Sequence, residues 1–115
     1  MADRSLTLFF RAVQVGVVTP TDSDWPWAWG TFARTIDPAD TLGVRGRLLR
    51  YMDYCIEADL MLTESGDEAW EAFTGANDER YLEFMDGGWR LVSAAGEAWE
   101  ATVVNFHTDG TVGWR

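Results

Sequence analysis

His107 is the only histidine among the 115 residues, so it is the first candidate for acid–base chemistry. A serine-hydrolase triad needs a nucleophile, a base and a group that orients the base. Ser93 and Asp109 would complete such a set with His107, but no G-x-S-x-G sequence presents the serine. We therefore expect a strand-end histidine that makes one hydrogen bond, and we predict no catalytic residue.

Metal and phosphate sites have even less support. One histidine and one cysteine, Cys55, on different predicted elements do not make a zinc site. Asp22 and Asp24 lack the glycine and the later ligands of a calcium-binding loop. No glycine-rich phosphate-binding sequence, such as G-x-x-x-x-G-K followed by Ser or Thr, occurs in the chain. We predict no bound metal and no cofactor.

Three arginines lie near the start of a predicted helix: Arg45, Arg47 and Arg50. Together with the free N–H groups of a helix N-terminus, they could hold one anion. The alternative is that they pair with nearby acids such as Asp40, Asp53 or Glu57. Because the chain holds nineteen carboxylates and nine arginines, we favour pairing.

Carboxylates also recur at helical spacing, as in Asp67 with Glu71 and Glu79 with Glu83. A glycosidase needs two carboxylates that flank a cleft. Like charges four residues apart instead share the surface of one helix and mildly destabilise it. We interpret these pairs as a solvated acidic face, which is better suited to recognising a basic partner than to catalysis.

The net charge of −10 excludes two classes of partner. The chain repels phosphate backbones and anionic membrane surfaces, so we predict no nucleic-acid binding and no membrane binding. It contains no lysine, which we attribute to a GC-rich bacterial genome. We see no signal peptide and no apolar run of about 20 residues, so we predict a soluble, cytoplasmic protein and leave its oligomeric state open.

Seven tryptophans are unusual for this length, and three of them crowd into the stretch DWPWAWG. Trp25, Trp27 and Trp29 alternate with smaller residues, so in a strand they share one face. Tryptophan is favoured both in cores and at interfaces, and we favour the core for the seven as a group. We expect Trp27 and Trp29 to be mostly buried, and Trp25, next to Pro26, to be partly exposed.

Hydrophobic periodicity predicts the elements that hold these residues. Apolar residues on both faces of Ser5–Val18 indicate either a buried central strand or a strand with a bulge near Gln14 to Gly16. A loop at residues 19–24 leads to a second strand, Trp25–Ile36. We expect these two strands to form a long antiparallel hairpin.

Two helices are predicted next. Asp37 or Asp40 is a suitable cap for the first helix, whose apolar stripe covers residues 44–62. Ser65 and Glu68 match a capping box for the second helix.

The segment Tyr81–Met85 suits either a short helix or a strand, and we prefer the helix. Three strands follow, separated by glycine-containing turns: Trp89–Ser93, Ala98–His107 and Thr111–Arg115. The predicted order is ββ-αα-βββ. We expect one globular α+β domain over residues 1–115, with two layers: an antiparallel sheet of about five strands, and helices packed on one face.

From these features we expect a non-enzymatic protein-interaction module that binds a basic protein, as inhibitors and immunity-type proteins do. The alternative is a small-ligand binding domain or a small enzyme, with a tryptophan-lined pocket between the first hairpin and the helices. The residues that we predict to bind a ligand or partner are Trp25, Trp27, Trp29, Arg34 and Arg45.

Overall fold

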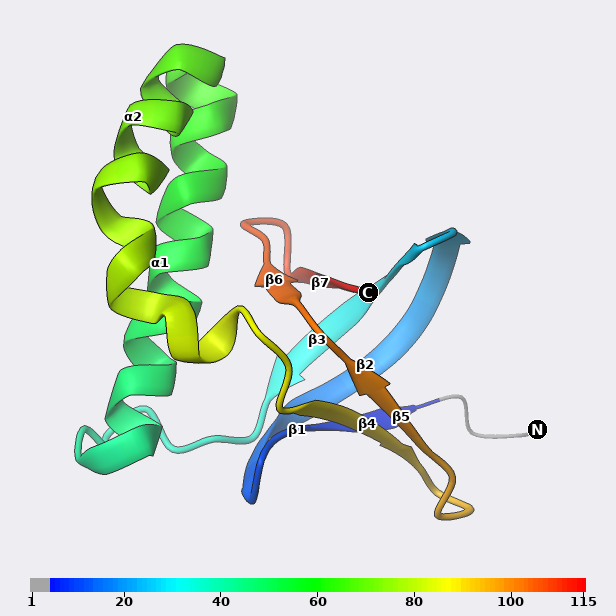
Figure 1. Cartoon of the computed structure of the whole chain (residues 1–115). Coiled ribbons are helices and arrows are strands. Elements are labelled where there is room, and N and C mark those ends of the chain that lie inside the picture. Colours follow the sequence, from blue (N-terminus) through cyan, green and yellow to red (C-terminus); the bar gives the residue numbers. More distant parts are fainter. Residues whose placement is uncertain (1–4) are drawn as a thin grey trace.

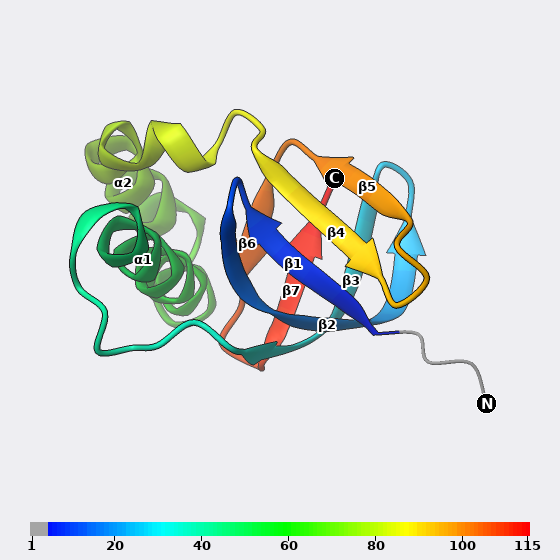
Figure 2. The ribbon, with the colours of Figure 1, turned by 90° about the horizontal axis from the view of Figure 1, so that it is seen from below.

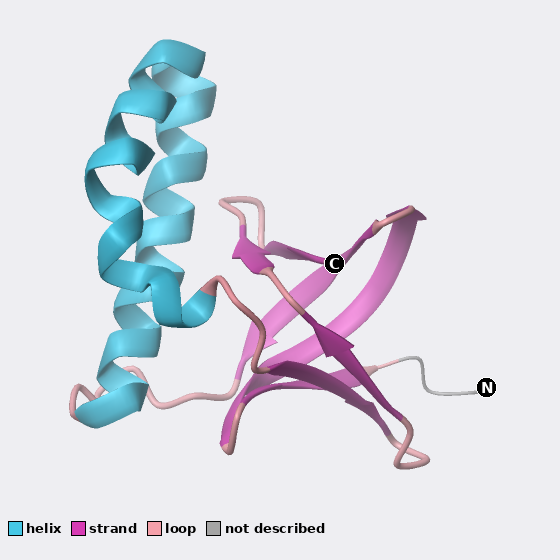
Figure 3. Ribbon diagram, in the orientation of Figure 1, coloured by secondary structure: helices cyan, strands magenta, loops and turns pink. Residues whose placement is uncertain are grey.

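The computed structural model describes residues 5–115, in which a helical hairpin stands beside a curled antiparallel sheet (Figure 1). The elements are β1 (Leu6–Phe10), β2 (Val13–Asp24), β3 (Trp27–Arg34), α1 (Gly43–Ser65), α2 (Asp67–Asn77), the 3-10 helix η1 (Asp78–Phe84), β4 (Trp89–Ser93), β5 (Ala98–Ala101), β6 (Val104–Phe106) and β7 (Thr111–Trp114). Figure 3 shows the separation of helices and strands. The predicted α+β class, with an antiparallel sheet and two helices, is confirmed.

The strands form one seven-stranded sheet in the order β5-β4-β1-β2-β3-β7-β6. Its two edge strands, β5 and β6, are consecutive in sequence and are separated by Thr102 and Val103. The three peptide units between Ala101 and Val104 span at most about 11 Å. The sheet must therefore curl until its two edges approach each other, and Figure 2 shows the resulting half-barrel.

The sheet has seven strands rather than the predicted five because two predicted strands each contain a break. Ser5–Val18 turns back at Arg11, whose φ of 52° lies in the left-handed region, and forms the hairpin β1–β2. Ala98–His107 is interrupted between β5 and β6, where two successive amides donate to the Arg115 carbonyl oxygen. Neither break contains the Gly or Asn that marks most tight turns.

The hairpin β2–β3 confirms the predicted long antiparallel pair, but its turn lies elsewhere. Residues 19–24, predicted to be a loop, extend β2, and Trp25 and Pro26 form the turn. A register shift opposite Leu8 and Phe9 leaves Val15 of β2 without a partner in β1. This irregularity lies within the predicted bulge, so β2 is both a central strand and a bulged strand.

The start of α1 differs from the predicted cap. The helix begins after Leu42 without a side-chain cap, so neither Asp37 nor Asp40 has the predicted role. Asp37 instead accepts a hydrogen bond from the Ala39 amide at 2.9 Å, which stabilises a local turn. Within residues 5–115, no helix combines the length and the apolarity needed to cross a membrane.

The predicted capping box of α2 is also wrong. Ser65 is the last residue of α1, and α2 follows it after Gly66, whose φ of 86° breaks the helix. Glu68 lies in the first turn of α2, where its charge suits the positive end of the helix. The segment Tyr81–Met85 lies mainly in η1, in agreement with the preferred helix.

An aromatic cluster fills the half-barrel where α1 and η1 close it. Phe10 contacts both Phe84 and Trp89, with ring centroids 4.8 Å and 4.9 Å away, and Tyr51 stacks on Phe84. The buried Trp89 donates its indole N–H to the Phe84 carbonyl oxygen at 2.9 Å. Because α1 supplies residues to this core and contacts β6, the helices close the mouth of the half-barrel rather than covering one face of a flat sheet.

Two glycines within helices should respond in opposite ways to alanine. A Cβ atom on Gly46 of α1 would overlap the Thr41 carbonyl oxygen, whereas one on Gly75 of α2 would meet nothing within 4 Å. We expect Gly75→Ala to raise the free energy of unfolding by about 0.5–1 kcal/mol, because alanine loses less backbone entropy. Gly46→Ala should lower it by about 1–3 kcal/mol. Urea denaturation measures both, and a shift of the same sign would contradict this packing.

Candidate functional site

Helix α1 covers the free edge of β6 with three side chains: Tyr51, Cys55 and Asp59. We call these three residues the edge seal. They are four residues apart and therefore project from one side of the helix. The Tyr51 hydroxyl donates to the Val104 carbonyl oxygen at 2.8 Å, and the Asp59 carboxylate accepts from the Thr108 amide at 3.0 Å.

The spacing of the edge seal matches that of the strand. Val103 and His107 form backbone hydrogen bonds with residues that belong to β7 or lie next to it. The backbone N–H and C=O groups of the alternate residues 104, 106 and 108 therefore point away from β7 and toward α1. Cys55 lies against the backbone of Phe106, between the two outer contacts. Unpaired groups at a sheet edge invite another strand, and the edge seal occupies the positions where that strand would pair.

The edge seal is structural rather than reactive. Burial raises the pKa of the Cys55 thiol to about 11, although hydrogen bonds with the Phe106 backbone and Tyr51 act in the opposite direction. Burial also raises the pKa of Tyr51. A thiol with such a pKa is protonated at neutral pH, so it is not a nucleophile there.

A cavity of about 360 Å³ lies beside the edge seal, between the helices and β6. We call it the groove, and its apolar wall is formed by Ala58, Leu62, Trp70, Met85 and Phe106. Leu62 and Trp70 are 38% and 37% exposed, so both also face solvent. Helix α2, which carries Trp70, has no buried residue, so its apolar side is only partly covered by the rest of the described chain.

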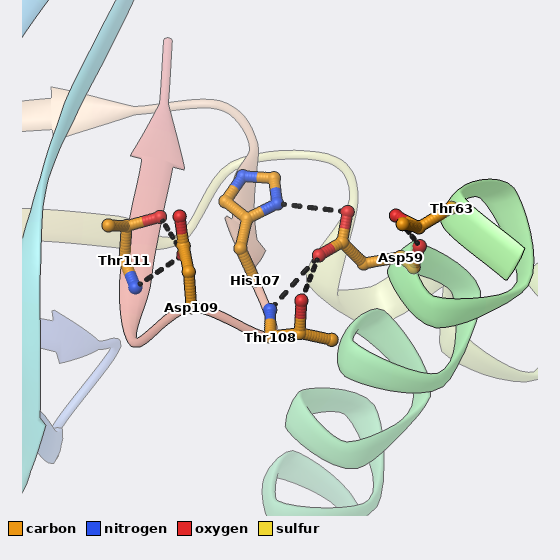
Figure 4. Close-up of polar contacts among 6 residues, drawn as sticks. All are labelled: Asp59, Thr63, His107, Thr108, Asp109 and Thr111. Atoms are coloured by element: carbon orange, nitrogen blue, oxygen red, sulfur yellow. Dashed lines mark hydrogen bonds and ion pairs between the residues drawn. The ribbon is translucent and has the colours of Figure 1, made fainter.

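Two acidic side chains, Asp59 and Asp78, belong to the polar part of the groove. Asp59 lies 3.6 Å from His107 Nδ1 and accepts from the Thr108 hydroxyl at 2.9 Å, as Figure 4 shows. Burial would raise the pKa of Asp59, but the hydrogen bonds from Thr108 and the proximity of His107 outweigh it and lower the pKa. The Tyr54 hydroxyl donates to Asp78 at 2.5 Å. His107 is the one basic side chain among the described residues that line the groove.

The triad considered for His107 is not assembled. His107 lies directly after β6, at a strand end as expected, but the acid beside it is Asp59. Asp109 bonds within its own turn, and the Ser93 hydroxyl accepts from the Glu97 amide. Among residues 5–115, no group of three or more His, Cys, Asp or Glu side chains is placed to hold a metal ion.

Trp25, Trp27 and Trp29 do not line the groove. Trp25 lies in the β2–β3 turn and is 91% exposed, well beyond the partial exposure expected. Trp27 and Trp29 share one face of β3, as predicted. That face is opposite to Phe32, which packs against the core, so both tryptophans are half-buried rather than mostly buried.

The chain around β7, rather than the helices, covers this tryptophan face. The Trp29 ring lies over Gly113, where a Cβ atom would be 2.9 Å from Trp29 Cδ1. The Arg115 guanidinium lies 5.1 Å from the centroid of the Trp27 ring. The groove therefore lies elsewhere than the expected tryptophan-lined pocket, and the binding role of the three tryptophans stays a prediction.

Arg34 and Arg45 are also separate from the groove. Arg34 lies 3.3 Å from Asp53 of α1, and Arg45 lies 3.6 Å from Asp40. The second pair is one of those that we favoured over an anion site. Exposed ion pairs contribute at most about 1 kcal/mol, so a partner could displace either one, and the binding role of both arginines stays a prediction.

Nearly all of the net charge lies in one segment, which runs from the middle of α1 through α2 into η1. Residues 53–83 hold ten of the nineteen carboxylates and a single arginine, Arg80. The rest of the chain holds nine carboxylates and eight arginines, so it is nearly neutral. This uneven distribution of charge is visible in the sequence. The net charge of the whole chain alone does not show it.

Tyr51→Phe tests the edge seal. The change removes the hydrogen bond to the buried Val104 carbonyl oxygen and leaves that acceptor unsatisfied, so we expect a loss of about 1–3 kcal/mol in the free energy of unfolding. Tyr54→Phe is the matched control, because its partner Asp78 is partly exposed and can bond to water. Urea denaturation compares them, and an equal loss in both would contradict the seal.

Asp59→Asn tests the low pKa of Asp59. The folded-state pKa lies below the ordinary value of about 3.9. Ionised Asp59 therefore stabilises the fold above that pH, and this contribution is lost as the pH falls through the folded-state pKa. We expect the variant to be less stable by about 1–2 kcal/mol at pH 7 and the difference to shrink toward pH 2. Thermal unfolding against pH measures it, with Asp86→Asn as the control; a constant difference would count against this assignment.

No protein-family model, curated protein or solved structure matches this chain. The geometry and the charge of the molecule are therefore the basis for inferring its function.

Proposed function

We propose that this chain is a non-enzymatic interaction domain that binds a basic protein through the helical hairpin α1–α2. The observation that carries the proposal is the charge of residues 53–83, with ten carboxylates and one arginine. Charges of one sign gathered in one part of a protein raise the local potential and speed the encounter with an oppositely charged partner. The residues outside α1, α2 and η1 hold nine carboxylates and five arginines, so their negative charge is much less concentrated.

Several acids of the hairpin are free to meet such a partner. Glu57, Glu64 and Glu71 are exposed, and none of their carboxylates forms a hydrogen bond or ion pair with another described residue. Glu83, in contrast, is held by Arg47 at 2.6 Å. A partner's arginine or lysine can therefore pair with the three free carboxylates without breaking an internal contact.

The chemistry around the groove supports binding rather than catalysis. Cys55 has a raised pKa and serves the edge seal, and Asp59 is held by Thr108. Neither group is activated as a nucleophile or as a base poised near neutral pH. A half-buried, unpaired cysteine also agrees with the reducing cytoplasm of a bacterial cell, where we place the protein.

A small-ligand binding domain is the second candidate, because a cavity of about 360 Å³ is within the usual size of ligand pockets. Such a pocket would differ from the tryptophan-lined one predicted, since Trp70 is the one tryptophan that lines it. This function would leave the charge of the hairpin without a role. We therefore rank it below the interaction domain.

Two triple variants with the same net charge test where a basic partner is attracted. Glu57→Gln, Glu64→Gln and Glu71→Gln together remove three charges from the hairpin. Stopped-flow fluorescence with an oligo-arginine peptide as the probe measures the association rate at several salt concentrations. We expect this variant to associate about three- to tenfold more slowly than the wild type at low salt, because steering is lost.

The matched control removes three exposed charges from the sheet side: Asp24→Asn, Glu97→Gln and Glu100→Gln. It should associate within about twofold of the wild type, because its hairpin is intact. An equal slowing of both variants would assign the attraction to net charge alone. A wild-type rate that does not change with salt would overturn the proposal.

A further inference from the structure

We propose that the groove binds an amphipathic α-helix of about three turns, whose apolar face enters the groove and whose outer face is basic. This inference rests on the proposed function and names the shape of the partner's contact. The groove is the region bounded by α1, α2 and β6 and walled by Ala58, Leu62, Trp70, Met85 and Phe106.

The length of the groove fits such a helix. Its α1 wall extends from Tyr51 to Leu62, which corresponds to about 16 Å at 1.5 Å per residue. Its β6 wall extends from Val103 to His107, which is about 13 Å of strand. Three turns of helix measure about 16 Å and present apolar side chains at positions i, i+4, i+7 and i+11. The occupant therefore matches the α1 wall in length and is about 3 Å longer than the β6 wall.

The edge seal selects a helix over an extended peptide. A strand that joins a sheet gains its affinity from unpaired backbone groups at the edge. On β6 those positions are already covered, by Tyr51 at Val104, by Cys55 at Phe106 and by Asp59 at Thr108. A helix satisfies its backbone hydrogen bonds internally, so it can occupy the groove without needing those groups.

The uncovered side of α2 supplies apolar contact area. Trp70 and Leu62 line the groove and are 37% and 38% exposed, and α2 has no buried residue. Tryptophan is frequent among the residues that dominate binding energy at interfaces. A docked helix would cover Trp70 from the side that the rest of the chain leaves open.

The carboxylates around the groove determine which side chains the outer face of the bound helix should carry. Asp59 and Asp78 line the groove, and no arginine of residues 5–115 does. The surrounding segment, residues 53–83, adds eight further carboxylates against Arg80. A second copy of this hairpin would bring ten more carboxylates to the contact, so like-charge repulsion disfavours a dimer through this face. A basic helix of another protein complements it.

The probe is a synthetic helical peptide of about four turns, built from alanine, with leucine along one face and arginine along the other. One control peptide has the same composition in an order that destroys the apolar face. A second control replaces each arginine by glutamate. Isothermal titration calorimetry with the full chain should give the tightest binding for the amphipathic basic peptide, by about tenfold or more over each control.

A matched pair of variants locates the binding. Leu62 lines the groove and Leu60 does not, yet both lie on α1 and are 38% and 41% exposed. Leu62→Gln should weaken the amphipathic peptide about fivefold or more, and Leu60→Gln should leave it unchanged. Trp70→Ala and Trp99→Ala form a second pair, because Trp99 is exposed on β5, away from the groove.

Four results would overturn the basic helix as the occupant of the groove. Equal binding of the ordered and scrambled basic peptides, or equal losses in Leu62→Gln and Leu60→Gln, would reject the groove while leaving the proposed function intact, provided that the hairpin triple variant still slows association. A dimer that Leu62→Gln dissociates would assign the groove to a second copy. Failure of every basic peptide to bind would overturn both the groove and the proposed function.

Discussion

The covering of the β6 edge by α1 is the contact on which the other features depend. The half-barrel ends at β6, whose backbone groups would otherwise be free, and Tyr51 reaches across to bond Val104 from 53 residues earlier in the chain. The same tyrosine stacks on Phe84 in the core. This one side of α1 therefore ends the sheet, places the helical hairpin at the mouth of the half-barrel, and supplies one wall of the groove.

Local sequence pattern predicted correctly the elements that depend mainly on local alternation of residues. The strand Trp89–Ser93 and the β2–β3 pairing follow from alternation and β-branched residues, and they are as predicted. The breaks that raise the strand count depend on distant partners instead. The Arg11 amide donates to the Gly88 carbonyl oxygen at 2.7 Å, and the Thr102 amide donates to Arg115 at 2.7 Å. Neither hydrogen bond can be inferred from the residues near the break.

The candidate site also combines features that the sequence shows with features that depend on the fold. The charge of residues 53–83 was present in the sequence, as was the four-residue spacing of Tyr51, Cys55 and Asp59. The apolar stripe predicted over residues 44–62 spans these positions, but nothing local in the sequence connects their spacing with β6. The groove joins Leu62, Trp70 and Phe106 from three elements, so it exists only after the sheet has curled and brought its last strands beside the helices.

The negative charge is also unevenly distributed over the molecule. Its densest part is residues 53–83, and the β2–β3 turn that holds Trp25 lies at the far side of the sheet from the helices in Figures 1 and 2. Under the proposed function, a basic partner would meet residues 53–83 first. Trp25, 91% exposed, then points outward, so a domain bound in this orientation still presents its most exposed aromatic side chain to the surrounding solution.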